Sequence, residues 1–250
     1  MDDTVEVNSD AGTYRLHVLP KDHISGIIRR TGRPYEEDLL SVISSFLGLG
    51  DVVVDVGANI GNHTIYWANR GFDVVAFEPY EDTRRVLERS IDLNGLGNRV
   101  SLRSEALGAF PGRARARQAT SGNLGSVVIE RVDGLEGEIG IVPLDALHLP
   151  RFHAVKIDVE GAEADVVRGA ERSIRRWRPI VAMEASGNQD EAERLLERMG
   201  YRRVPSSFGI TPVVLYVPRL RDLFRPFVLR EIVVPRLRSL ARRLGVSGPR

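Results

Sequence analysis

Short apolar runs alternate with amphipathic segments along most of the chain. Runs of about four to eight residues rich in Val and Ile predict buried strands, and apolar residues spaced three and four positions apart predict helices. The predicted strands cover 51–57, 73–79, 99–107, 153–161 and 178–186, and the predicted helices between them cover 63–71, 82–95, 162–176 and 188–200. This alternation predicts an α/β fold with a mainly parallel twisted sheet and helices on both of its faces.

Other stretches depart from this alternation. The interval 113–149 contains two segments that alternate like antiparallel strands, so we expect an insertion beside the sheet. Two runs within 201–218 predict a C-terminal antiparallel hairpin. We therefore divide the chain into a polar N-terminal lead-in (1–34), with one strand near 14–19 and otherwise loops, a main domain (35–218) that opens with a helix at 35–48, and an arginine-rich C-terminal tail (219–250).

The composition excludes several classes of protein. A length of 250 residues suits one α/β domain with a full core. Without cysteine the chain can form neither a disulfide framework nor a thiolate metal site, and a net charge of +1 argues against general nucleic-acid binding. No apolar run approaches the roughly 18 residues that a membrane span needs, and the acidic N-terminus is no secretory signal, so we expect a cytoplasmic protein.

A glycine-bearing turn, GANIG at 57–61, follows the strand at 51–57 and precedes a helix. Gly57 and Gly61 allow the backbone to approach a ligand, and Asn59 lies between them. The dinucleotide pattern G-x-G-x-x-G is absent, and Asp55 would repel a pyrophosphate. The turn therefore favours a cationic ligand, such as one that carries an ammonium or sulfonium group.

Acidic residues follow the next two strands. Glu78 lies about 20 residues beyond the glycine turn, where a carboxylate can accept hydrogen bonds from both ribose hydroxyls. Glu105 and Ala106 end the third strand, where a carboxylate can accept a hydrogen bond from an adenine amino group. A ribose, an adenine and a cation in one site describe S-adenosylmethionine (SAM), which we expect to contact these residues together with Asp55 and the glycine turn.

The segments DVVVDVGANIGNHT, AFEP, VKIDVEGAEADVVRGA and PIVAMEA, in this order, resemble the FkbM family of SAM-dependent methyltransferases. The resemblance covers about residues 35–204, and Tyr35-Glu36 fits the family's entry helix. It implies a Rossmann-like class I methyltransferase that mostly methylates hydroxyl groups. The lead-in, the 113–149 insertion and the tail match no motif, and we expect them to select the substrate.

Lys156, Asp158 and Glu160 follow one another at alternate positions, which project to one side of a strand. Because charged residues in an apolar run are costly unless paired or near solvent, we expect Asp158 beside the methyl acceptor and Glu160 binding the acceptor or the base. Lys156 would pair with one of them. The alternative is a structural ion pair, with Glu160 favouring a helix N-terminus.

Two further side chains are candidates for the site. Glu184 ends the strand that follows, and with Asp158 and Glu160 it offers an oxygen-only set that could hold Mg²⁺. His63 follows the glycine turn, where it is either a base or a residue that caps or packs the helix start. The glycine-rich loop 121–126 is either a plain turn or a lid over the acceptor.

The sequence therefore predicts methyl transfer from SAM to a hydroxyl of a small molecule, sugar or glycolipid. The alternatives are N-methylation or carboxyl methylation on the same fold, a nicotinamide oxidoreductase, and a binding module without cofactor. Nucleic acid is disfavoured as the acceptor, since the expected site is ringed by carboxylates and shows no aromatic stacking platform. The tail 219–250 lies on an anionic membrane surface, docks an acidic partner or is a solvated end.

Overall fold

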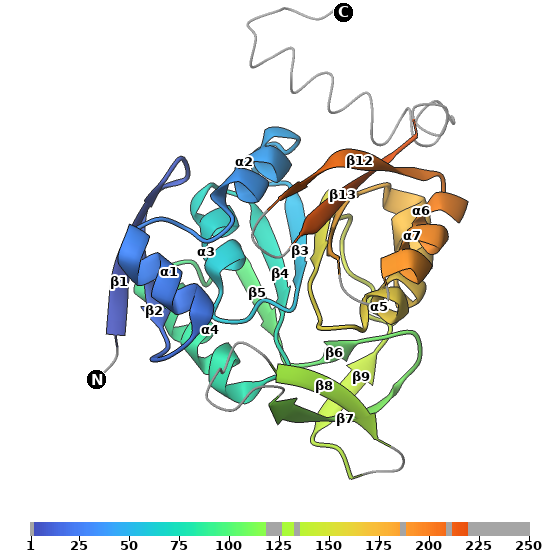
Figure 1. The fold of residues 1–250 in the computed structure, drawn as a ribbon, viewed down its shortest axis with the longest axis horizontal. Coiled ribbons are helices and arrows are strands. Elements are labelled where there is room, and N and C mark those ends of the chain that lie inside the picture. The colour runs from blue at the N-terminus through green and yellow to red at the C-terminus, as the bar shows by residue number, and fades with distance from the viewer. Residues whose placement is uncertain (1–2, 119–126, 133–135, 186–188, 209–211, 220–250) are drawn as a thin grey trace, which may run out of the picture.

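The computed structural model describes residues 3–118, 127–132, 136–185, 189–208 and 212–219 (Figure 1). Its centre is a seven-stranded sheet in the order β12-β13-β11-β10-β3-β4-β5. Within this sheet β13 is antiparallel to both of its neighbours, whereas the other pairs are parallel. The strands are β3 Val52–Val56, β4 Asp73–Phe77, β5 Val100–Arg103, β10 Ala154–Ile157, β11 Ile180–Glu184, β12 Tyr201–Phe208 and β13 Val213–Pro218.

The sheet is thus Rossmann-like, mainly parallel and closed by an antiparallel hairpin, as the sequence predicts. From β3 the chain winds outward through β4 and β5, and it then returns to β10 on the other side of β3. Ligands of open α/β sheets bind at the carboxyl ends of the strands where the winding reverses. The edge of β3 and β10 is therefore the expected place for a site.

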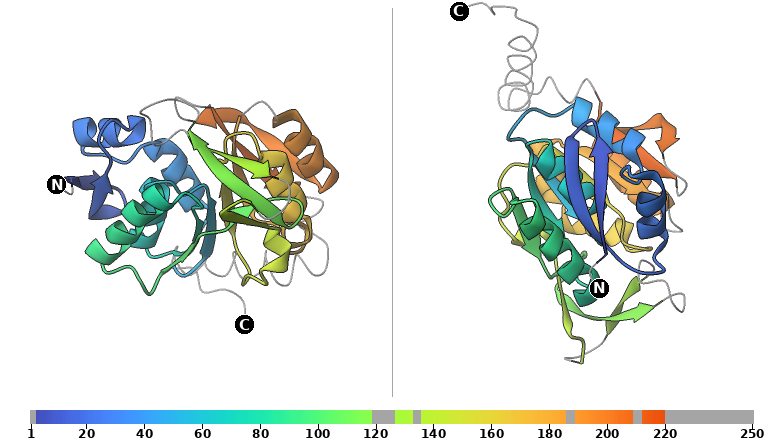
Figure 2. Two further views of the ribbon diagram at one scale, coloured as in Figure 1. Left: turned by 90° about the horizontal axis from the view of Figure 1, so that it is seen from below. Right: turned by 90° about the vertical axis from the view of Figure 1, so that its left-hand side faces the viewer.

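Helices cover both faces of the sheet (Figure 2). Val53 of β3 packs in one apolar cluster with residues of the helices on its face, and Val54 packs in a second cluster on the opposite face. The first face carries α2 Glu37–Ser45, α3 Asn62–Asn69 and α4 Glu81–Leu93, and the second carries α5 Glu163–Gly169, α6 Glu171–Trp177 and α7 Gln189–Arg198. Adjacent residues of a buried strand thus serve opposite cores.

The helix predicted over 162–176 is in fact two helices, α5 and α6, which meet at Ala170. Gly169 lies so close to the carbonyl of Gly108 that an added Cβ would come within 2.1 Å of that oxygen. The chain therefore changes direction at a point of tight backbone packing. Helical periodicity alone does not reveal such a contact.

The N-terminal lead-in is part of the fold, so the expectation of loops after one strand is wrong. It forms a hairpin of β1 Asp3–Ser9 and β2 Gly12–Val18, followed by α1 His23–Thr31. Val7, Leu16 and Ile28 are fully buried in the same cluster as β3. The polar outer face of the hairpin and the glycine within α1 hide this packing in the sequence.

The insertion and the short strand β6 that precedes it form a separate four-stranded sheet in the order β6-β9-β7-β8, and the antiparallel pair β7-β8 confirms the predicted antiparallel strands. Its members are β6 Ala106–Leu107, β7 Gly112–Gln118, β8 Val127–Val132 and β9 Ile139–Val142, and a short 3₁₀ helix, η1 Leu144–Ala146, follows. The predicted turn or lid at 121–126 and the tail from 220 onward lie outside the described residues. Among the helices described here, none is long and apolar enough to cross a membrane.

We predict that Gly57→Ala destabilises the fold. Gly57 has φ +79°, and an added Cβ would lie 1.8 Å from the Asp158 carbonyl oxygen. Both the strained backbone and the clash act on the folded state, so the loss should be about 2 kcal/mol or more. Urea unfolding measures it.

The matched control is Gly26→Ala in α1, where an added Cβ meets nothing within 4 Å. Alanine favours a helix interior over glycine, so this variant should gain about 0.5–1 kcal/mol. Equal unfolding midpoints for the two alanine variants would contradict the close packing at Gly57.

Candidate active site

Two adjoining cavities lie at the carboxyl ends of the central strands. The wider cavity has a volume of about 280 Å³ and the narrower one about 130 Å³. Their walls share residues from the ends of β3, β4, β8 and β10, namely Gly57, Pro79, Ile129 and Val159. The two cavities thus form neighbouring chambers of one site, with the small sheet of the insertion as one wall.

The glycine turn shapes the wider cavity chiefly by its backbone path. Gly57, Asn59 and Gly61 all have positive φ, but only the first two line the cavity. The N–H groups of Gly57 and Ala58 donate to the Phe77 carbonyl, and Gly61 N–H donates to Ala58. These amides are therefore engaged within the protein and form no phosphate cradle. Gly61 begins α3 and packs against Leu87.

Asp55 does not lie where the sequence suggests. It is fully buried and lines neither cavity. Its carboxylate accepts a hydrogen bond from Thr64 Oγ1 at 2.6 Å and lies 3.6 Å from the Lys156 ammonium. Asp55 therefore supports the wall of the site from behind, because its position on β3 directs it toward α3.

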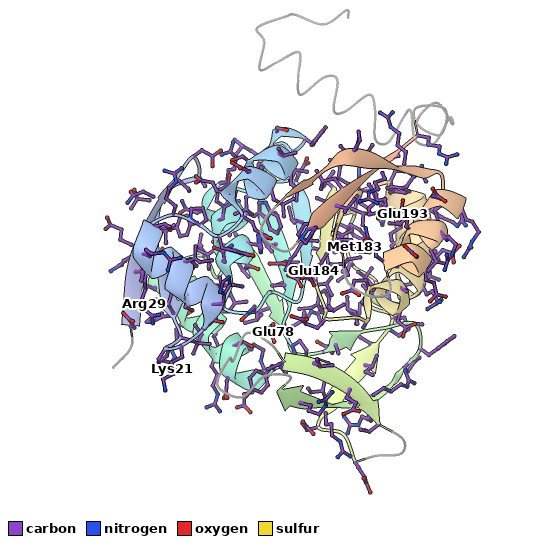
Figure 3. All side chains as sticks on the ribbon, in the orientation of Figure 1. Lys21, Arg29, Glu78, Met183, Glu184 and Glu193 are labelled. Carbon is purple, nitrogen blue, oxygen red and sulfur yellow. The ribbon has the colours of Figure 1, made fainter. Side chains whose placement is uncertain are left out.

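Glu78 lies at the end of β4 and lines the wider cavity (Figure 3). Its two oxygens accept hydrogen bonds from the N–H groups of Asn59 at 2.7 Å and Tyr80 at 2.9 Å. Burial raises its pKa. A carboxylate has about four acceptor positions, so each oxygen can still accept a ligand hydroxyl.

Asn59 carries an unsatisfied acceptor beside Glu78. Its side-chain oxygen is buried and has no hydrogen-bond partner within the described chain. A buried acceptor that makes no hydrogen bond costs about 1–3 kcal/mol. A ligand in the wider cavity that donates a hydrogen bond would remove this cost.

Lys156 connects the two central strands. Its ammonium lies 3.1 Å from Asp158 Oδ2 and donates to the Gly57 carbonyl at 3.0 Å. The predicted pairing of Lys156 with Asp158 is thus confirmed. Burial disfavours the charged ammonium, but Asp158 and Asp55 outweigh this effect, and the pKa of Lys156 lies above its ordinary value. Lys156 is a cation throughout the physiological range and cannot act as a base.

Asp158 and Glu184, which both line the wider cavity, are joined by a hydrogen bond. Burial, the negative charge of Asp158 and a hydrogen bond to it raise the pKa of Glu184 to about 8. Although burial opposes it, Lys156 holds the pKa of Asp158 below its ordinary value. At neutral pH Glu184 is therefore mostly protonated and donates to the Asp158 carboxylate.

Glu160 lies at the rim of the same cavity, but not on the strand. β10 ends at Ile157, and Glu160 adopts a left-handed conformation with φ 53°. The expected strand-like alternation of Lys156, Asp158 and Glu160 is therefore wrong beyond the strand end. Burial and the negative charge of Asp158 raise the pKa of Glu160.

A Glu36–His63 pair completes the wider cavity. His63 Nε2 lies 3.1 Å from Glu36 Oε2, and both side chains are almost fully buried. The His63 ring stacks on Trp67 at 5.7 Å, and the Asn62 side chain exchanges two hydrogen bonds with the Tyr35 backbone. His63 thus faces the site, and no sequence pattern indicates Glu36 as its partner.

The narrower cavity has mainly apolar walls, with two acids, Glu105 and Asp165, and one arginine, Arg131. Glu105 and Ala106 line it, together with Leu107, Ile129 and Ile141. Both predicted residues follow β5 rather than end it, because that strand stops at Arg103. A mainly apolar chamber with a carboxylate at Glu105 suits the polarity of an adenine ring.

The expected Mg²⁺ site is not supported. Among the described residues no three acidic or histidine side chains are grouped so that they could hold a metal ion. Asp158 and Glu184 instead hold a proton between them.

Comparison with known proteins identifies a family. The family model described as a methyltransferase FkbM domain matches residues 55–203. The hexuronic acid methyltransferase AglP of Haloferax volcanii is 28% identical over 169 residues, which cover 64% of this chain and 67% of AglP. The AMB antimetabolite synthetase AmbE of Pseudomonas aeruginosa is 27% identical, and the match covers 73% of this chain but only 11% of AmbE.

A tRNA (guanine(37)-N(1))-methyltransferase of Danio rerio is 26% identical, covering 69% of this chain and 41% of that enzyme. The absence of a nucleic-acid partner therefore stays a prediction.

Solved structures agree on the fold. The T. thermophilus 16S rRNA N2 G1207 methyltransferase in complex with AdoMet and guanosine has a TM-score of 0.51 at 16% identity, covering 87% of this chain and 50% of that one. The methyltransferase FkbM of Methylobacillus flagellatus has a TM-score of 0.47 at 20% identity, covering 70% and 45%. Likeness at this level concerns the fold alone.

We predict that Glu184 makes the stability depend on pH. Its pKa is about 8 in the folded chain and near 4.5 when unfolded. Between these values the folded chain binds more protons, so the free energy of unfolding falls as pH rises. Glu184→Gln cannot titrate, and its urea midpoint should fall less than that of the wild type between about pH 5 and about pH 8.5.

The control is Glu197→Gln, which changes an exposed carboxyl of α7 and should keep the wild-type pH dependence. If the urea midpoint of Glu184→Gln changed with pH as steeply as that of the wild type, the protonation of Glu184 at neutral pH would be contradicted.

Proposed function

The chain belongs to the FkbM family of methyltransferases, and we propose that it transfers a methyl group from SAM to a hydroxyl of a small molecule or glycan. The observation that supports this most is a buried histidine–carboxylate pair, Glu36–His63, in the same cavity as Asp158. Deprotonation of an alcohol needs such a base. The adjoining apolar chamber provides a separate place for the nucleoside of the cofactor.

The residues present fit SAM. Glu105 and the apolar walls of the narrower cavity would hold the adenine, and the free acceptor positions of Glu78 would hold the ribose hydroxyls. The unpartnered oxygen of Asn59 would accept a hydrogen bond from the cofactor. When bound, SAM supplies an electrophilic methyl group on a sulfonium that leaves as a neutral thioether.

His63 is the proposed general base. Donation from Nε2 to Glu36 fixes the tautomer and leaves the Nδ1 lone pair to take the proton of the acceptor hydroxyl. A positioned base of this kind contributes about 10²–10⁴-fold to the rate. Glu36 also stabilises the imidazolium that forms.

Asp158 is the proposed orienting group for the acceptor. Lys156 and Glu184 fix its carboxylate from two sides, so it can accept a hydrogen bond from the hydroxyl in one defined direction. Its lowered pKa makes it a weaker base than a histidine. Glu160, at the exposed rim, would bind a second hydroxyl of the acceptor. Fixed orientation of this kind lowers the barrier by several kcal/mol.

The rival reactions fit the site less well. The only lysine that lines the wider cavity is engaged by Asp55 and Asp158, and no arginine lines the described part of it, so a carboxylate acceptor finds no counter-charge. The engaged amides of the glycine turn offer nothing to the pyrophosphate of a nicotinamide cofactor. N-methylation stays open, because the same base could deprotonate an amine.

We predict that the wild type binds S-adenosylhomocysteine with micromolar affinity and gives no signal with NADH in calorimetric titration. In Glu78→Ala the affinity should fall at least about tenfold, because hydrogen bonds to a charged group contribute about 1.5–3 kcal/mol each. Glu78→Gln separates charge from shape, and Glu81→Ala, an exposed neighbour, is the control. Binding of NADH in preference to S-adenosylhomocysteine would contradict the proposal that SAM is the cofactor.

We predict that Asp158→Asn lowers turnover about 10²-fold or more, while the affinity for S-adenosylhomocysteine stays within about threefold. His63→Gln should behave likewise. Turnover is measured with labelled SAM and hydroxyl acceptors, among them uronic acid glycosides, and the methylated product should survive mild alkali, which cleaves methyl esters. Unchanged turnover in Asp158→Asn, against the exposed control Asp190→Asn, would refute its role.

A further inference from the structure

One carboxylate oxygen of Asp22 has no hydrogen-bond partner within the described chain. Asp22 precedes α1, and its Oδ2 accepts a hydrogen bond from the Ser25 N–H at 2.8 Å. Its other oxygen, Oδ1, is buried and has no partner in the described chain, and the residue is only 3% exposed. An N-cap needs one acceptor oxygen, which serine supplies as well as aspartate. The second oxygen is therefore surplus to the cap.

Asp22 is one of the residues that line the wider cavity. His23 and Ile24, the first residues of α1, line it as well. No ion pair to Asp22 occurs among the described residues, and the N-terminus of α1 offsets only about half a charge. A hydroxyl ligand would satisfy the hydrogen bond of Oδ1 but leave the charge, whereas a cation would satisfy both.

The other residues that line the cavity also favour a positively charged ligand. Glu36 and Glu160 also line it, and Lys156 is already held by Asp55, Asp158 and the Gly57 carbonyl. The His23 and Tyr35 rings, which both line the cavity, meet edge to face at 6.4 Å. Aromatic rings tolerate an ammonium group and do not attract an anion.

We propose that Asp22 anchors a primary ammonium group in the wider cavity. Two sources share this chemistry, the amino-acid end of the methyl donor and an amino group on a sugar acceptor. The inference rests on the proposed function, and it assigns a ligand contact to a segment that the sequence presents as a mere lead-in.

The decisive variant is Asp22→Ser, which keeps an N-cap oxygen for Ser25 and removes only the surplus one. An unchanged urea midpoint shows that the cap survives. Calorimetry then compares S-adenosylhomocysteine with 5′-methylthioadenosine, which lacks the amino-acid end. If the ammonium is that of the donor, affinity for the homocysteine compound falls about tenfold or more and affinity for methylthioadenosine stays unchanged.

The second arm titrates D-glucosamine and D-glucose into protein saturated with S-adenosylhomocysteine, with saturation-transfer NMR as the readout. If the ammonium is that of the acceptor, glucosamine binds in preference to glucose, and Asp22→Ser abolishes the preference while both nucleosides bind as before. Asp22→Asn, which keeps the shape but not the charge, should lose the same binding as Asp22→Ser.

The proposal is overturned if Asp22→Ser changes neither the homocysteine compound nor glucosamine binding, or if it weakens both nucleosides equally. Absence of glucosamine binding to the wild type together with unchanged nucleoside affinities in the variant also overturns it. Failure of both nucleosides to bind the wild type would refute the proposed function instead. The glucosamine titration would then be run on the nucleoside-free protein, and the preference for glucosamine and its loss in Asp22→Ser would decide on Asp22 alone.

Discussion

One buried cation joins the two strands between which the winding of the sheet reverses. Lys156 of β10 and Asp55 of β3 are register partners, and the ammonium also contacts Asp158 and the Gly57 carbonyl. A buried ammonium is tolerated only where carboxylates and hydrogen bonds replace its hydration. Because these partners come from both strands and from the glycine turn, one charge holds the floor of the site together.

The charges of the cavity follow from this cation. Lys156 keeps Asp158 ionised, and ionised Asp158 in turn keeps Glu184 protonated. Two carboxyl groups on adjacent strand ends thus acquire opposite protonation states at neutral pH, which avoids the repulsion of two buried anions. The arrangement leaves a fixed acceptor at Asp158 beside the separate Glu36–His63 pair.

Much of this was visible in the sequence, for physical reasons. Val-rich runs have few alternatives to buried strands, and a lysine and an aspartate within such a run, as at Lys156 and Asp158, have to pair. Glu36 and His63 lie 27 residues apart and meet because Asn62 holds the Tyr35 backbone. A contact of this kind depends on tertiary packing and on the positive φ of Glu36. Neither of these produces a periodic pattern of residues that could be recognised in the sequence.

Two of the expectations that failed concern charged side chains near the end of a strand. Asp55 was expected at the ligand because strands end at the site, yet it lies far enough inside β3 to point toward α3. Glu160 was expected on a strand that ends at Ile157. Side-chain direction near the end of an element depends on where the element stops, and this boundary is what a sequence pattern defines least well.

The division between matched and unmatched segments has a chemical meaning. Residues 55–203, which match the family model, contain His63, Glu78, Lys156, Asp158 and Glu184, the groups that would bind the cofactor and move the proton. Asp22, Tyr35, Glu36 and Val213 line the same cavity but lie outside that range. The proposed base therefore spans the division, since its histidine comes from one side and its carboxylate from the other. A change in the N-terminal segment can thus alter both the shape of the wider cavity and the hydrogen-bond partner of His63, without any change in the glycine turn or in the Lys156 cluster.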